Sequence, residues 1–376
     1  MDRLLSPHRV VVAGLLVLAL AGGAVAATAP ASSQPAAGPQ EASGRAAISG
    51  LPTRAYWADA YAAGDDKDAE LYSPGTAFNR TAGAVEITRP AGTTGRYLVR
   101  FDRLSSFLGA RSTVKVSGSA SNTSGTPWNC SPTSSRLVDD VIDVRCYETG
   151  TGAAANAYFQ VFVTRNYNDN AFAYANQPTR TGYTPPSNSS WNPRGAIKVY
   201  RDGVGVYRVA FTGLGSVTSS TGGHVQVSAV GTAKVYCKVA NWLGSPDVTV
   251  SVRCFSAAGA PIDSKFNVFF TFWNEHLAYA WGNDASSASY TPSAFYSFNP
   301  ASGSITIRHR ARGWYTAEWT GAQNSIVPFG TAQVTGYSTD NSQCTQDGPG
   351  EYFVDVRCFD PSGQPVDAYY TVLLGS

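Results

Sequence analysis

The sequence has little charge and no basic runs. Charged residues make up 14% of its 376 residues, whereas ordinary soluble domains have roughly 25%. The net charge is +2 and no run of lysine or arginine exceeds two residues, so the basic footprint of a nucleic-acid-binding protein is missing. With so few charges, the surface must be covered mainly by Ser, Thr, Asn and Gly. We therefore expect no nucleic-acid partner.

Long apolar runs are missing after residue 26. Nothing later in the chain approaches the ~20 apolar residues that a transmembrane helix needs. Residues 1–26 start with a positive region that includes Arg3 and Arg9, continue with a short apolar core and end in Ala24-Val25-Ala26, which predicts a cleaved signal peptide. Residues 27–50 are almost entirely Ala, Ser, Pro, Gly and Gln, so we expect a disordered leader, either a linker or a propeptide. The sequence predicts a secreted, extracellular protein with no transmembrane segment.

Motifs for catalysis and metal binding are also missing. The sequence contains no Gly-x-Ser-x-Gly, His-Glu-x-x-His or Cys-x-x-Cys motif. The histidines after the leader are His224, His276 and His309, which occupy different positions in the repeated units described below. A Ser-His-Asp arrangement assembled in space stays open, because such triads are not sequence motifs. We expect no enzymatic activity, no metal and no cofactor.

What the sequence does contain is one stretch that occurs three times. It reads Val-Ile-Asp-Val-Arg-Cys at 141–146, Val-Ser-Val-Arg-Cys at 250–254 and Val-Asp-Val-Arg-Cys at 354–358. Apolar and polar residues alternate in each copy, which predicts an extended strand with the cysteine on its buried face. Other segments recur with it. Each copy has an Ala-Tyr pair, such as Ala173-Tyr174 and Ala278-Tyr279, and a later Gly-x-Tyr segment that opens a strand.

Each copy has one further cysteine upstream of the repeated stretch. The chain has six cysteines, which gives one pair per copy and an even count in an exported protein. Zinc is the alternative, but the histidines do not accompany the cysteines. The predicted disulfides are Cys130–Cys146, Cys237–Cys254 and Cys344–Cys358.

The short, turn-punctuated strands and the domain-sized period predict an all-β fold. We expect three tandem disulfide-stapled antiparallel β-sandwich domains. Copy one is residues 51–165, copy two is residues 166–272 and copy three is residues 273–376. These three names are used for those ranges throughout.

Two tryptophan-asparagine pairs near the first cysteine of a copy are the candidate ligand site. Trp128 with Asn129 and Asn241 with Trp242 lie in turn-rich sequence that is compatible with exposure to solvent. If exposed, a ring could stack on a sugar while the amide bonds its hydroxyls. Burial of each tryptophan over its disulfide is the favoured alternative.

Two charged features also invite a functional interpretation. Asp65, Asp66, Asp68 and Glu70 could bind Ca²⁺, although a solvated acidic loop is the better explanation of them. Arg145, Arg253 and Arg357 recur on the outward face of the repeated strand, where cross-strand pairing or an anionic ligand would explain them.

The copies resemble tandem-repeat secreted proteins of actinobacteria. The resemblance is carried by the segment 205–211, the Val-x-Val-Arg-Cys-Phe run at 250–255 and the Gly-x-Pro-x-Asp-Ser run at 259–264, and it extends over residues 51–376. It implies no activity. We expect a non-enzymatic extracellular binding protein whose partner is a polysaccharide or a cell-surface component. A structural or protein-interaction repeat array and a secreted hydrolase stay open as alternatives.

Overall fold

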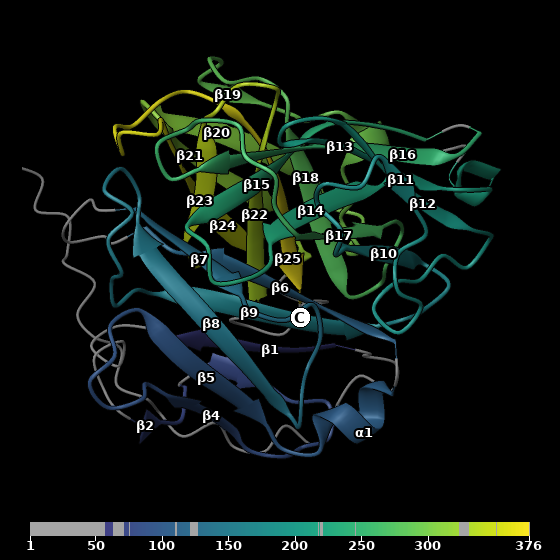
Figure 1. Ribbon diagram of the computed structural model, residues 1–376. Coiled ribbons are helices and arrows are strands. Elements are labelled where there is room, and N and C mark those ends of the chain that lie inside the picture. The colour runs from purple at the N-terminus through teal and green to yellow at the C-terminus, as the bar shows by residue number, and fades with distance from the viewer. Residues whose placement is uncertain are drawn as a thin grey trace, which may run out of the picture. The chain divides into compact units, whose positions relative to one another are not determined.

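The computed structural model describes residues 57–62, 71–74, 76–109, 111–120, 127–216, 218, 221–244, 246–322, 331–350 and 352–375. These residues form mainly antiparallel β-sheets, together with the short helix α1 (Leu104–Leu108) (Figure 1). All of them belong to one compact unit. Within this part of the chain, no helix has the length and apolarity needed to cross a membrane. The predicted signal peptide (1–26) and leader (27–50) lie outside the described residues.

Copy one contains two sheets. The first has the strand order β2-β4-β5-β8-β7 and the second has the order β3-β1-β9-β6. The strands are β1 (Trp57–Ala62), β2 (Leu71–Tyr72), β3 (Thr76–Phe78), β4 (Val85–Thr88), β5 (Arg96–Phe101), β6 (Ser112–Gly118), β7 (Trp128–Pro132), β8 (Val141–Glu148) and β9 (Phe159–Arg165).

Copy two has the corresponding strand orders β11-β12-β13-β16-β15 and β10-β17-β14. Its elements are β10 (Asn170–Ala175), β11 (Gly182–Tyr183), β12 (Ile197–Gly203), β13 (Val206–Phe211), the 3-10 helix η2 (Leu214–Ser216), β14 (His224–Ala229), β15 (Val235–Leu243), β16 (Val248–Ser256) and β17 (Phe266–Thr271).

Copy three has the orders β19-β20-β21-β24-β23 and β18-β25-β22. Its elements are β18 (Leu277–Gly282), β19 (Ser289–Tyr290), the 3-10 helix η3 (Ala294–Tyr296), β20 (Ile305–Ala311), β21 (Trp314–Trp319), β22 (Thr331–Tyr337), β23 (Gln343–Pro349), β24 (Phe353–Phe359) and β25 (Tyr369–Gly375). A parallel bridge between Val239 and Tyr337 joins β15 of copy two to β22.

Alternating burial along the repeated stretch explains why it forms a strand. In β8, Ile142, Val144 and Cys146 are buried, while Asp143 and Arg145 are only partly covered. Strands β16 and β24 alternate in the same way. Most buried apolar residues fall into three large clusters, each drawn from a single copy. A smaller fourth cluster combines buried residues of all three copies, namely Phe162, Phe172, Phe269, Leu277 and Leu373.

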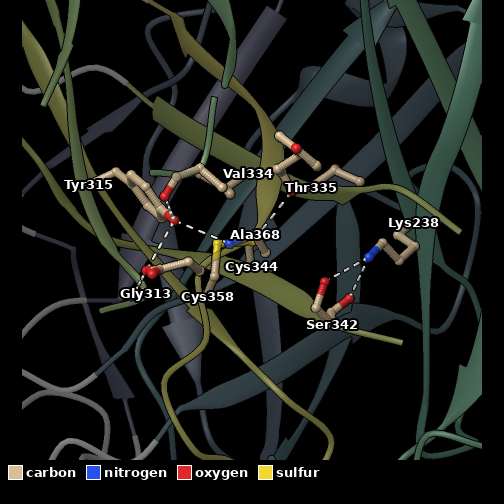
Figure 2. Close-up of a disulfide and its surroundings, with 12 residues drawn as sticks. Lys238, Gly313, Tyr315, Val334, Thr335, Ser342, Cys344, Cys358 and Ala368 are labelled. Atoms are coloured by element: carbon tan, nitrogen blue, oxygen red, sulfur yellow. Dashed lines mark hydrogen bonds between the residues drawn. A yellow bond between two sulfur atoms is a disulfide. The ribbon is translucent and has the colours of Figure 1, made fainter. Parts of the chain in front are cut away.

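The three predicted disulfides are confirmed. Cys130–Cys146, Cys237–Cys254 and Cys344–Cys358 each join residues that lie directly opposite on neighbouring strands, with Cα atoms 4.0–4.1 Å apart. The described chain has no free cysteine. Figure 2 shows the third disulfide. Three such bonds indicate an oxidising environment such as the extracellular space.

The recurring Gly-x-Tyr segment is explained by a shared turn. The glycine has a positive φ of 65–66° in all three copies, and a Cβ there would come within 2.4–2.5 Å of a cysteine carbonyl oxygen. In copy three, the Gly313 N–H donates to Asp367 Oδ1 at 2.7 Å, and the Ala368 N–H donates to the Tyr315 hydroxyl at 3.1 Å (Figure 2). Only glycine fits this position without strain.

Polar side chains are buried where the copies meet. Gln160 in β9, Asn267 in β17 and Thr371 in β25 each have 0% exposure. Gln160 accepts a hydrogen bond from a backbone N–H of copy three. Asn267 Nδ2 donates to Val114 O of copy one at 2.9 Å, and Thr371 Oγ1 donates to Val225 O of copy two at 2.8 Å. Copy one therefore contacts copy three, copy three contacts copy two, and copy two contacts copy one in a closed cycle.

A buried lysine also links copies two and three. Lys238 is 1% exposed, and its Nζ donates to Asp340 Oδ1, to Ser342 O and to Ser342 Oγ at 2.8–2.9 Å (Figure 2). Because a carboxylate and two further oxygens accept from it, this ammonium is satisfied despite its burial.

Lys115 is buried between copies one and two, and it has fewer hydrogen-bond acceptors than Lys238. It is 1% exposed, and its Nζ donates to the backbone oxygen of Asn267 at 3.1 Å. Burial holds the pKa of the Lys115 amine well below its ordinary value. The strand register places Gln226 and Gln333 at the corresponding positions of the other copies.

We expect Lys115→Gln to stabilise the protein. Below pH 10.5, the Lys115 amine of the unfolded chain is protonated, whereas burial disfavours the protonated amine in the folded chain. Lys115 therefore lowers the free energy of unfolding further as the pH falls. Burying a poorly compensated polar group costs on the order of 1–3 kcal/mol, which is the expected gain at pH 7. Denaturant unfolding at pH 7 and pH 9.5 measures the increase in the free energy of unfolding, which should be smaller at the higher pH. The exposed Lys198→Gln variant is the control, and a loss of stability in Lys115→Gln at both pH values would contradict the expectation.

Candidate functional site

The first tryptophan-asparagine pair is built into the fold. Trp128 is 7% exposed, and its ring lies edge-on to Tyr158 with centroids 5.2 Å apart. Asn129 Nδ2 donates to Thr149 Oγ1 at 2.8 Å and to Gln343 Oε1 of copy three. The buried alternative holds for this tryptophan, because β7 pairs with β8 and carries the ring into the core beside its disulfide.

The second pair differs in its two residues. Trp242 is 3% exposed, and its Nε1 donates to Gly222 O at 2.8 Å. Asn241 is exposed, and its Oδ1 accepts a hydrogen bond from the Tyr337 hydroxyl at 3.3 Å. The buried alternative therefore holds for Trp242 as well, and aromatic rings of copy three cover it. Ligand binding at Asn129 and Asn241 stays a prediction, but neither tryptophan offers a free ring face.

The recurring arginines and the acidic cluster are the charged features that the sequence singled out. Arg145 pairs with Asp143 at 3.0 Å and Arg357 pairs with Asp347 at 2.9 Å, so pairing accounts for two of the three recurring arginines. The acidic residues 65–70 lie outside the described ranges. In the part of the chain that the structure describes, no group of three or more His, Cys, Asp and Glu residues could hold a metal ion.

The histidines are placed as structural residues. His224 is fully buried, and burial lowers its pKa to about 3. His309 Nε2 lies 2.9 Å from Asp367 Oδ1. The corresponding pair in copy two is Arg201 and Asp263 at 2.8 Å, so the histidine occupies the position of an ion pair.

An open hollow of about 420 Å³ lies at the meeting of copies one and two. Residues from the end of α1, from the loop between β9 and β10, and from the segment after β11 form its walls. They are Phe107, Leu108, Gly109, Arg165, Asn166, Tyr167, Asn168 and Trp191. We call this feature the junction hollow. Its lining combines three aromatic rings, one guanidinium and two amides, with no carboxylate.

Arginines lie over the aromatic rings at the junction hollow. The Arg165 guanidinium carbon is 4.6 Å from the ring centroid of Phe107, and that of Arg80 is 5.8 Å from the same centroid. Arg111 lies 5.3 Å from the ring centroid of Trp191. Cation–π contact of this kind orients a guanidinium and leaves its N–H edges available.

Hydrogen bonds fix the loop of the junction hollow. Arg165 Nη1 donates to Phe107 O at 3.0 Å, which ties the strand end to α1. Trp191 Nε1 donates to Tyr167 O at 2.8 Å. The buried Asn170 side chain donates to Arg165 O and accepts from the Tyr167 N–H, both at 3.1 Å. The walls are thus positioned without any ligand.

The helix α1 is held at its other end by Asp140. The Ser105 N–H donates to Asp140 Oδ1 at 2.6 Å and the Arg103 N–H donates to Oδ2 at 3.1 Å. Although burial raises the pKa of Asp140, these hydrogen bonds hold it below its ordinary value. The carboxylate therefore stays ionised at neutral pH and anchors the helix beside the hollow.

A smaller hollow of about 200 Å³ shares Leu108 and Gly109 with the junction hollow. We call it the second hollow. Its polar side chains include Ser105, Arg136 and Asp139. The two hollows therefore adjoin along the end of α1, where Gly109 has no side chain to separate them.

Comparison with family models, curated protein sequences and solved structures finds no match for this chain. The candidate site therefore depends on its own geometry. The aromatic-Asn pair Trp191-Asn192 has phenylalanine in the other copies, Phe78 and Phe298, which predicts a core residue, whereas the ring of Trp191 is only partly buried and borders the hollow. The missed signal is a difference between copies: the strand register aligns Arg165 with Phe272 in copy two.

Proposed function

We propose that the protein is a secreted, non-enzymatic binding protein that holds an extracellular carbohydrate or cell-wall polymer in the junction hollow. The observation that carries the proposal is the lining itself, with aromatic rings beside a guanidinium and two amides in an open concavity. Apolar rings cover the faces of sugars, while amide and guanidinium groups bond their oxygens.

The rigidity of the walls supports the same proposal. The loop 165–170 is fixed by buried Asn170 and by Trp191, and α1 is anchored by Asp140. A preformed site loses little conformational entropy when a ligand binds. A long polymer could also engage several protein molecules at once and gain by avidity.

A structural or protein-interaction role is the second candidate. Burial of Trp128 and Trp242 favours it, because the rings first considered for sugar binding contribute to cores instead. Hydrolysis has less support, since His309 takes the place of an arginine in an ion pair and His224 is fully buried.

We also propose that the three copies are tandem β-sandwiches of residues 51–165, 166–272 and 273–376. The strand order that recurs in each range and the large apolar cluster of each range support this division, in which β22 of copy three extends a sheet of copy two into one of eight strands. The buried polar contacts between copies then act as joints between sandwiches.

We expect the double variant Arg165→Gln with Tyr167→Ala to lose most of its retention on polysaccharide and cell-wall particles. Tyr167 is 39% exposed, so its ring is removable without opening a core. Loss of one charge-assisted hydrogen bond and one stacked ring amounts to about 2–3 kcal/mol, or at least a tenfold decrease in affinity. A pull-down with insoluble particles measures the retained fraction.

The matched control is Arg208→Gln. Its guanidinium also lies over a ring, at 4.9 Å from the centroid of Tyr200, but it pairs with Asp202 on β12. This variant should be retained like the native protein. Equal retention of the double variant, with an unchanged melting temperature, would remove the junction hollow from the binding site.

A further inference from the structure

Two of the three rings at the junction hollow, Phe107 and Trp191, already have a face occupied by a guanidinium group. Arg165 lies over Phe107 and Arg111 lies over Trp191. A neutral sugar cannot stack on a face that a guanidinium covers. A planar guanidinium held against a ring instead presents its N–H edge, which matches the two oxygens of a carboxylate or a phosphate.

The charges around the hollow favour an anion. In the described part of the chain, neither Arg111 nor Arg165 forms an ion pair with a carboxylate. The nearest acidic residue in the loop, Asp169, accepts a hydrogen bond from Asn274 Nδ2 at 2.9 Å. Other arginines of copy one differ, since Arg96 and Arg145 each pair with Asp143 at 3.0 Å. Among the described residues, Arg111 and Arg165 therefore have no carboxylate partner.

The second hollow has a different chemistry. Arg136 and Asp139 supply donors and a carboxylate acceptor, and Leu108 with Val138 supplies apolar surface. Val138 is 50% exposed, so this surface is accessible. A carboxylate beside a guanidinium suits the hydroxyl groups of an uncharged sugar better than it suits a second anion.

We propose that the two hollows together form one site for an acidic polysaccharide in which charged and neutral sugars alternate. The acidic group binds at Arg165 in the junction hollow and at Arg111, which lies over the Trp191 ring at its wall, and the neighbouring neutral sugar lies in the second hollow beyond Gly109. This inference rests on the proposed function, because it names the class of polymer and its orientation in the same site. The shared chemistry of the first position is an anionic group on a polymer, supplied by a uronate or a phosphodiester.

The experiment measures affinity of the full mature chain for defined polymers. The probes are hyaluronan, in which glucuronate and N-acetylglucosamine alternate, its carboxyl methyl ester, uncharged dextran and a glycerol-phosphate polymer. The native protein should bind hyaluronan about tenfold more tightly than the methyl ester, as expected for loss of one charge-assisted pair. Arg165→Gln should remove this preference. Asp139→Asn should weaken binding of both forms about equally, and Arg208→Gln should leave both unchanged.

The outcomes separate the inference from the proposed function. Equal affinity for hyaluronan and its methyl ester, with both weakened by Arg165→Gln, would overturn acid selectivity and leave polymer binding in place. Binding of the glycerol-phosphate polymer and of no other probe would overturn a uronate as the acidic group and would also overturn the binding of a neutral sugar in the second hollow. Equally tight binding of single-stranded DNA would overturn recognition of sugars. Failure to bind any probe or cell-wall particle would overturn the proposed function itself.

Discussion

Trp242→Ala is expected to destabilise the protein by about 3–5 kcal/mol, the range for removing a large buried aromatic side chain. The ring is 3% exposed and packs against Trp281, Tyr296 and Tyr337 with centroids 5.0–5.7 Å apart. Alanine would leave a cavity between copies two and three. It would also leave Gly222 O without the hydrogen bond from Nε1.

Chemical denaturation of the oxidised protein measures this effect, and Trp273→Ala is the matched control. Trp273 is 47% exposed, so its truncation should change stability by no more than about 1 kcal/mol. Trp242→Phe should fall between the two, since it keeps a ring but loses the N–H donor. A Trp242→Ala variant of native stability that no longer binds polysaccharide would restore the interpretation of this residue as a sugar-stacking face.

His224 is expected to make the protein sensitive to acid. Burial lowers its pKa from 6.5 to about 3, so between these values the unfolded chain binds a proton that the folded chain does not. Stability therefore falls as the pH falls below 6.5, and the contribution between pH 7 and pH 4 is about 3 kcal/mol. The groups around the imidazole offer no counterion: Gln226 Nε2 lies 2.8 Å away and the Tyr279 ring stacks at 5.0 Å.

Denaturant unfolding at pH 7, 5.5 and 4 measures the slope. The variant His224→Thr carries the residue that the register places there in the other copies, Thr113 and Thr331, and should lose most of the slope whatever its stability at pH 7. His276→Gln is the control, because His276 is only half-buried and its pKa is lowered less completely by burial. A native slope in His224→Thr would show that other groups cause the acid sensitivity.

The all-β fold and the disulfides could be predicted because their signals are local. Alternation along β8 placed Cys146 on the buried face, and one extra cysteine per copy left a single pairing for each. Burial of the polar residues Gln160, Asn267 and Thr371 could not be predicted in the same way. Their positions alternate with the core residues of the strand, so the sequence pattern marks them as solvent-facing, and only the neighbouring copy covers them.

The alignment of the Ala-Tyr pairs was wrong by two residues. Ala173 pairs with Val268 in β17, and the residue that pairs with the equivalent Val372 in β25 is Ala280, not Ala278. The true counterpart of Ala173-Tyr174 in copy three is thus Ala280-Trp281. A shift of two residues keeps every side chain on the same face of a strand, so the pattern of polarity cannot detect it.

The candidate site was missed for a related reason. Searching for residues that recur directs attention to the shared framework, whereas Arg165 and Phe107 belong to copy one alone. The approach of Arg111 to Trp191 joins two copies and depends on how they pack. For Trp242, burial was the favoured interpretation, but its own copy gives no sign of the aromatic residues that copy three places over it.

The closed cycle of buried polar contacts connects the three copies of one polypeptide in the way that the interfaces of a cyclic trimer connect three separate subunits. In a trimer of identical chains every interface must be the same, since each subunit offers one surface to the next. Covalent linkage removes that requirement, and here the three interfaces have diverged: the buried side chain is an amide of one length at Gln160, of another at Asn267, and a hydroxyl at Thr371. Each joint accepts one partner only. The three copies therefore need not be identical, and each assembles with its own specific neighbour. A single copy can then acquire a surface, such as the one beside α1, that the other two copies lack.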